Sequence, residues 1–167
     1  MTGFADGVKS RSTDARARRL DRVDRSDQEE YAVTLSFDNP AGAPAPVGAY
    51  SQVARLDLPG VALLTLAGQV AMADDGSVVA PGDMAAQAAR VFEIIEKLLA
   101  AHGGSFADVM HLRAFVTDMA GRPAYAAARL KAMGEHTPAS TLLEISSLAI
   151  PGLVLEVEVT AAVRTSG

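Results

Sequence analysis

Apolar residues recur at helical spacing between positions 84 and 102. They are Met84, Ala88, Val91, Phe92, Ile95, Leu98 and Leu99, and this spacing puts them on one face of a helix. Asp83 precedes the pattern as a suitable N-cap, and Gly103 follows it as a suitable C-terminal stop. On the outer face Glu93 and Lys97 stand four residues apart, which favours an ion pair. The pattern therefore predicts an amphipathic helix.

Alternation of apolar and polar residues predicts strands on both sides of this helix. Before it, the strand pattern covers 31–37, 50–58 and 61–67, and Pro59-Gly60 predicts the turn of a hairpin. After it, three strands and a second helix are expected, over 109–116, 140–145 and 153–163 for the strands and from near Pro123 to near Gly134 for the helix. From residue 50 onward this β-β-α-β-α-β-β order predicts an α+β domain, a mixed sheet with two helices on one face.

The faces of two strands can be read from the same alternation. In 109–116 one face holds Met110, Leu112, Ala114 and Val116, and the other holds Val109, His111, Arg113 and Phe115. In 153–163 the residues Leu153, Leu155, Val157 and Val159 oppose Val154, Glu156, Glu158 and Thr160. The sheet face away from the helices thus mixes apolar and charged groups. Such a face suits either solvent or a subunit interface with a polar pocket.

Composition and charge divide the chain into two parts. Residues 1–30 hold seven basic and seven acidic side chains, whereas the rest holds eight basic and thirteen acidic ones. The stretch 9–30 has too few apolar residues to offset the entropy of ordering, so 1–30 is expected to be a disordered extension or a marginal helix. Residues 31–167 are expected to form one domain. The acidic charge of that domain gives no reason to expect a nucleic acid partner.

Several other classes are disfavoured by what the sequence lacks. There is no cysteine and no apolar run of the roughly 18 residues that a membrane helix needs. The start lacks the layout of a signal peptide, so the expected location is the cytoplasm. His102, His111 and His136 have no ligand at metal-site spacing, and no Gly-rich phosphate loop or nucleophile elbow is present. We therefore expect neither a metal nor a cofactor.

Four short segments occur in a familiar order. They are PVGAYSQ at 46–52, LAGQV at 66–70, FVTDM at 115–119 and LEVEV at 155–159. Together they resemble the Rid family of YjgF-type imine and enamine deaminases, over about residues 39–163. The resemblance implies a chorismate-mutase-like fold, a homotrimer, and small-molecule pockets in the clefts between subunits.

The resemblance also implies roles for individual residues. Tyr50 matches a tyrosine that lines the cleft, and Gly68 matches a glycine whose N–H holds the substrate carboxylate. Glu156 matches the glutamate that positions the attacking water. Gln69 and Phe115 join the residues expected to contact the substrate.

One segment departs from the family pattern. The family's Pro-Ala-Arg-Ser-Cys appears here as 138–142, with Ser140, Thr141 and Leu142 at the last three positions. Arginine would bind a substrate carboxylate through two hydrogen bonds, and losing it costs on the order of 2–4 kcal/mol. Three hypotheses follow: an imine or enamine hydrolase, a Rid-fold enzyme repurposed for a different step on a neutral or bulkier substrate, and a non-catalytic binder of small molecules or chaperone-like protein. An imine- or enamine-type enzyme with an altered substrate is preferred.

Two other arginines could supply the missing charge. Arg113 lies on the strand face that the resemblance directs toward the cleft. Arg122 lies where relatives usually have an apolar residue near a neighbouring subunit. Alternatively, both are surface arginines with acidic partners.

Overall fold

The structure, a computed structural model, describes residues 33–165. The extension expected over 1–30, and the first two residues of the strand expected at 31–37, lie outside the described residues.

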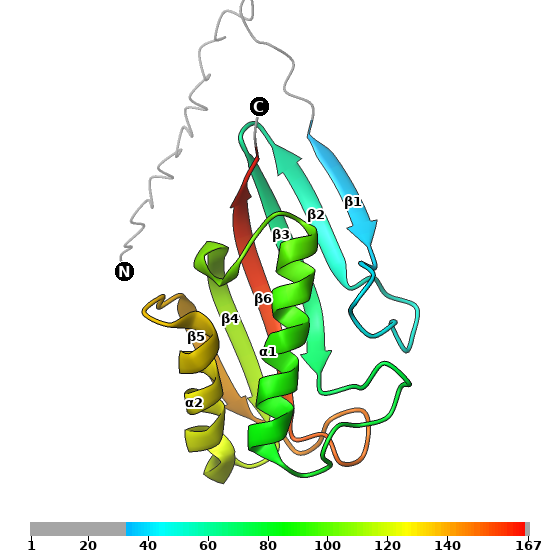
Figure 1. The fold of residues 1–167 in the computed structure, drawn as a ribbon, viewed down its shortest axis with the longest axis vertical. Coiled ribbons are helices and arrows are strands. Elements are labelled where there is room, and N and C mark those ends of the chain that lie inside the picture. The colour runs from blue at the N-terminus through cyan, green and yellow to red at the C-terminus, as the bar shows by residue number, and fades with distance from the viewer. Residues whose placement is uncertain (1–32, 166–167) are drawn as a thin grey trace, which may run out of the picture. The chain divides into compact units, whose positions relative to one another are not determined.

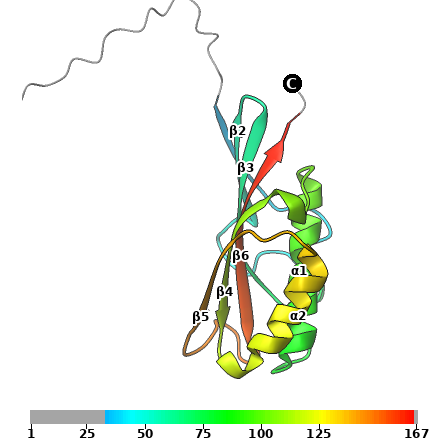
Figure 2. The ribbon, with the colours of Figure 1, turned by 90° about the vertical axis from the view of Figure 1, so that its left-hand side faces the viewer.

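A six-stranded mixed sheet forms one layer, and two helices pack on one of its faces (Figures 1 and 2). The strands are β1 (Thr34–Asp38), β2 (Val53–Leu58), β3 (Val61–Val70), β4 (Val109–Val116), β5 (Ala139–Glu144) and β6 (Leu155–Arg164), in the spatial order β1-β2-β3-β6-β4-β5. Only β4 and β5 pair in parallel, because helix α2 crosses over between them. The predicted α+β fold with both helices on one face is confirmed.

Both helices begin and end where the sequence predicts. In α1 (Met84–Ala101) the Asp83 carboxylate accepts hydrogen bonds from the N–H groups of Ala85 and Ala86, at 2.9 and 3.1 Å. Gly103 follows with a φ of 77°, which favours glycine. Helix α2 (Arg122–Met133) carries Pro123 in its first turn. Two short 3-10 turns, Phe106–Asp108 and Met119–Gly121, precede β4 and α2.

The core lies between the helices and the sheet and is almost wholly apolar. Its fully buried side chains include Leu64, Val91, Ile95, Leu98, Leu112, Leu155 and Val157. Among the described residues three glutamines are the buried polar side chains, Gln52, Gln69 and Gln87. Gln87 of α1 is the most deeply buried of them, and its three hydrogen bonds account for its burial. Its amide nitrogen donates to the carbonyls of Ala80 and Gly152, and its oxygen accepts from Val154 N. Gln87 thus holds the loops before α1 and before β6 against the core.

A bulge in β4 corrects one prediction of side-chain direction. Val109 is opposite Ala161 of β6 and His111 is opposite Thr160, so Met110 is an extra residue in the ladder. As a result Val109 is buried and Met110 is 52% exposed. The expectation that Met110 faces the core and Val109 faces away was therefore wrong. From Leu112 onward the predicted alternation holds.

Candidate functional site

A second bulge, in β3, brings Gly68 against Glu156. Leu66 is opposite Val159 of β6 and Gln69 is opposite Val157, so Ala67 and Gly68 share one opposing residue. A Cβ added to Gly68 would lie 2.6 Å from Cδ of Glu156 and closer still to its Oε1. Only glycine leaves room for the carboxylate there. Two residues that the sequence assigned to one site are thus in contact, and we call them the Gly68–Glu156 site.

The Glu156 carboxylate has a raised pKa. Partial burial is the main cause, and the negative charge of Glu158 adds to it. Among the described residues no side chain stabilises its charge with a hydrogen bond or an ion pair. A carboxylate in this state accepts a proton from water more readily than an ordinary one.

Tyr50 and Gln69 both lie close to Gly68. Tyr50, Gly68 and Gln69 line one small cavity of about 30 Å³. The Gln69 side chain is 4% exposed, and its amide donates to Gln52 Oε1 and to the Ala67 carbonyl. Because its donor is used within the chain, Gln69 supports the bulge from the core side. That Gln69 contacts a substrate stays a prediction, and no local sequence pattern reveals its supporting role.

On the face of the sheet away from the helices, which we call the open face, Phe115 stands opposite Glu156 in the ladder. Arg113 stands opposite Glu158, and its Nη1 lies 2.7 Å from Oε2 of that residue. Thr141 of β5 pairs with Arg113 in register and so shares this face. Glu158 thus neutralises the charge of Arg113 within the chain. This agrees with the alternative that Arg113 is a surface arginine with an acidic partner.

Ser140 and Leu142 lie on the other face of the sheet. They pair with the buried Leu112 and Ala114 of β4, and they line a groove of about 400 Å³ between β5 and α2. We call this the α2 groove. Its lining comprises Arg122, Tyr125, Ala126, Arg129, Leu130, Met133, Gly134, His136, Thr137, Ser140 and Leu142.

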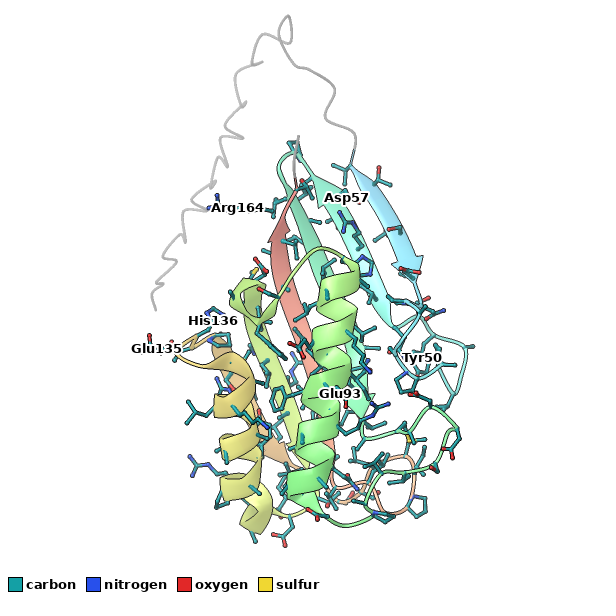
Figure 3. All side chains as sticks on the ribbon, in the orientation of Figure 1. Tyr50, Asp57, Glu93, Glu135, His136 and Arg164 are labelled. Carbon is teal, nitrogen blue, oxygen red and sulfur yellow. The ribbon has the colours of Figure 1, made fainter. Side chains whose placement is uncertain are left out.

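The structure thus divides the expected site residues into two groups. Gly68, Glu156 and Tyr50 form one, and the α2 groove with Ser140 and Arg122 forms the other. Figure 3 has Tyr50 on one side of α1 and His136, at the end of the groove, on the other. Arg129 and Tyr125 also belong to the second group, although neither was expected there from the sequence. Arg122 and Arg129 are seven residues apart, which puts both on similar faces of a helix, and that spacing was the available signal.

Neither a metal cluster nor a membrane-spanning helix occurs in the part of the chain that the structure describes. No three His, Asp or Glu side chains of residues 33–165 come together as metal ligands would. None of the helices in that range is both long and apolar enough to cross a membrane.

Comparison with known proteins gives one consistent result. A family model described as Endoribonuclease L-PSP matches residues 41–163. A RutC family protein of Pyrococcus horikoshii is 29% identical over 119 residues, which cover 71% of this chain and 90% of that protein. A crystal structure of a yeast protein matches with a TM-score of 0.70 and 27% identity, covering 78% of this chain and 100% of the other. A Rid family protein of unknown function from Yersinia pestis matches with a TM-score of 0.69 and 26% identity, with the same coverage.

Proposed function

This chain belongs to the endoribonuclease L-PSP family, which includes the Rid (YjgF-type) proteins, and from that premise we propose that it acts on small imine- or enamine-type metabolites. The reaction takes place in a cleft between the subunits of a homotrimer. The observation that carries this proposal is the Glu156 carboxylate, which has a raised pKa and lies in contact with Gly68.

The division of the site supports a cleft between subunits. Glu156 lies on the open face, whereas Ser140 and Arg122 line the α2 groove on the helix-covered face. One chain alone does not bring these groups together, so a shared site needs a second copy. The open face also carries exposed apolar side chains, with Leu35 of β1 59% exposed and Phe37 65% exposed. Such a surface favours association. Light scattering at micromolar concentration is expected to give the mass of a trimer, and a stable monomer would contradict it.

The chemistry assigned to Glu156 is general-base catalysis. The carboxylate accepts a proton from water as the water oxygen forms a bond with the imine carbon. The carboxyl then gives this proton to the nitrogen, which completes a carbinolamine. The hydroxyl proton of the carbinolamine next moves to the nitrogen through the Glu156 carboxylate, the carbon–nitrogen bond breaks, ammonia leaves and the carbon becomes a carbonyl. Tyr50 shapes the cleft around the substrate, and the backbone N–H of Gly68 donates to one of its polar groups.

The substrate is expected to differ from that of arginine-bearing relatives. Serine at position 140 has neither charge nor reach, and Leu142 makes its surroundings less polar. Ser140→Arg combined with Leu142→Cys is expected to tighten binding of a small 2-oxo acid by ten-fold or more, measured by calorimetry. No change in affinity would indicate that the cleft is shaped for another class of ligand.

A coupled assay tests the activity itself. Amino-acid oxidase generates imines from a panel of amino acids, and semicarbazide competes for them as they form. The protein is expected to accelerate imine hydrolysis for part of the panel, and Glu156→Gln is expected to remove most of the acceleration. The absence of acceleration across the panel would favour the alternative, a non-catalytic binder of small molecules. Cleavage of RNA by the same preparation would instead favour the activity named in the family description.

A further inference from the structure

The arginines of residues 33–165 differ in whether an acidic side chain forms an ion pair with them. Arg55 forms an ion pair with Asp57, and Arg90 forms ion pairs with Asp74 and Glu93. Arg113 forms one with Glu158. Arg122, Arg129 and Arg164 have no carboxylate partner among the described residues. Two of these three, Arg122 and Arg129, line the α2 groove. The groove therefore holds two positive charges that no acidic side chain of the described residues neutralises through an ion pair.

None of the described residues that line the groove is acidic, and much of its surface is apolar. Leu130, Met133 and Leu142 contribute to its lining, and Leu130 is 67% exposed. At about 400 Å³ the groove is within the size range of small-molecule sites. Cations beside an apolar surface favour a ligand with one anionic group and an apolar body.

The order of the elements in the chain determines where the two arginines lie along β5. Helix α2 runs opposite to β5, since it crosses over between two parallel strands. In agreement, Met119 N, just before α2, donates to Glu144 Oε2 at the end of β5. Along the direction of β5, Arg129 therefore lies nearer to Ser140, and Arg122 lies nearer to Leu142. Seven residues of helix separate the two arginines by about 10 Å along its axis.

A buried hydroxyl lies beside these charges. Tyr125 is 4% exposed, and its hydroxyl has no hydrogen-bond partner among the described residues. Its pKa is raised by burial and lowered in part by the positive charge of Arg129, which places that guanidinium nearby. The positive charge of Arg129 therefore lies close to the part of the groove wall that Tyr125 forms.

We infer that the α2 groove binds an organic anion, a carboxylate joined to an apolar body, through Arg129 and Arg122. The family pattern implies a positive charge on the strand at position 140, and in this chain helix α2 supplies that charge instead. The inference rests on the proposed function only for the reaction of the bound ligand. Binding itself is measured without that reaction.

Calorimetry on the full chain with three probes tests the ligand class. The probes are 3-phenylpropionate, its neutral isostere 3-phenylpropanamide, and acetate. The expected result is that 3-phenylpropionate binds at least ten-fold more tightly than either of the others. Equal affinity for the acid and the amide would overturn the inference, and so would the absence of binding by the acid.

Variants then test the location. Arg129→Gln and Arg122→Gln are each expected to weaken 3-phenylpropionate binding by ten-fold or more, and Arg129→Lys is expected to retain most of it. Lys131→Gln is the matched control, since Lys131 is on the same helix but faces α1, and its effect should be under two-fold. A loss in Arg113→Gln with none in the α2 variants would place the anion on the open face and overturn the inference. Groove binding without imine hydrolysis would leave the inference standing and refute only the proposed reaction.

Discussion

The two faces of the sheet are built from the same strands, yet their side chains are buried to different extents. On the helix-covered face Leu112, Leu155 and Val157 are fully buried within the chain. On the open face the alternate positions of these strands carry Arg113, Phe115 and Glu156, which stay partly or largely exposed. The covered face determines the fold, and the open face leaves groups exposed for the proposed assembly and chemistry. Four comparisons of variants test this contrast.

Leu112 and Phe115 of β4 offer the sharpest comparison. Leu112→Ala creates a cavity in the core and is expected to lower the free energy of unfolding by about 3 kcal/mol or more. Phe115→Ala removes a larger side chain from the open face, and we expect a smaller loss of stability but a weaker association of the proposed trimer. Urea denaturation measures the first effect and light scattering the second. Equal losses of stability would contradict the contrast between the faces.

Gln87 tests whether the polar group within the covered face is stabilising. Gln87→Leu keeps a similar volume but leaves two carbonyls and Val154 N–H without their partner. The expected loss is about 2 kcal/mol. Glu96→Leu, at an exposed position of the same helix, is the control, with a change below about 0.5 kcal/mol. If Gln87→Leu stabilises the protein, the hydrogen bonds contribute less than apolar packing would.

Gly68 and Glu156 test the contact on the open face. Gly68→Ala forces the carboxylate aside and is expected to cost about 1 kcal/mol. In the background of Glu156→Ala the same substitution should cost much less, because the group that it displaces is gone. A double-mutant cycle from denaturation curves measures this coupling. Additive effects would show that the two residues do not depend on each other.

The pH dependence of Glu156 is the smallest effect. Since its pKa is raised in the folded state, the protonated form favours folding. Its contribution to stability is complete below the unfolded pKa of about 4.3 and is lost as the pH rises through the folded pKa. Glu156→Gln is therefore expected to have a higher Tm than the parent at pH 7 and an equal one below pH 4. The side chain is half-buried, so solvent screening keeps the gain below about 1 kcal/mol. A difference that does not change with pH would contradict the raised pKa.

The sequence predicted the elements well because their causes are local. The apolar spacing of α1, the Asp83 cap and the glycine stops depend on residues within a few positions of one another. The alternation of β6 likewise identified Glu156 as a residue of the open face. The resemblance to the Rid family, confirmed by the family match over 41–163, named Gly68 and Glu156 together, and the structure has them in contact.

Tertiary structure alone decided which way several side chains point and which of them meet. The bulges at Met110 and at Ala67-Gly68 arise from pairing with β6, a strand distant in sequence, and each reverses the alternation that a local pattern assumes. They turned Val109 and Gln69 into the core. The pairing of β5 with β4 likewise turned Ser140 toward helix α2 and its two arginines. The residue types were thus determined by the sequence, whereas their grouping depended on a strand register that only long-range hydrogen bonding fixes.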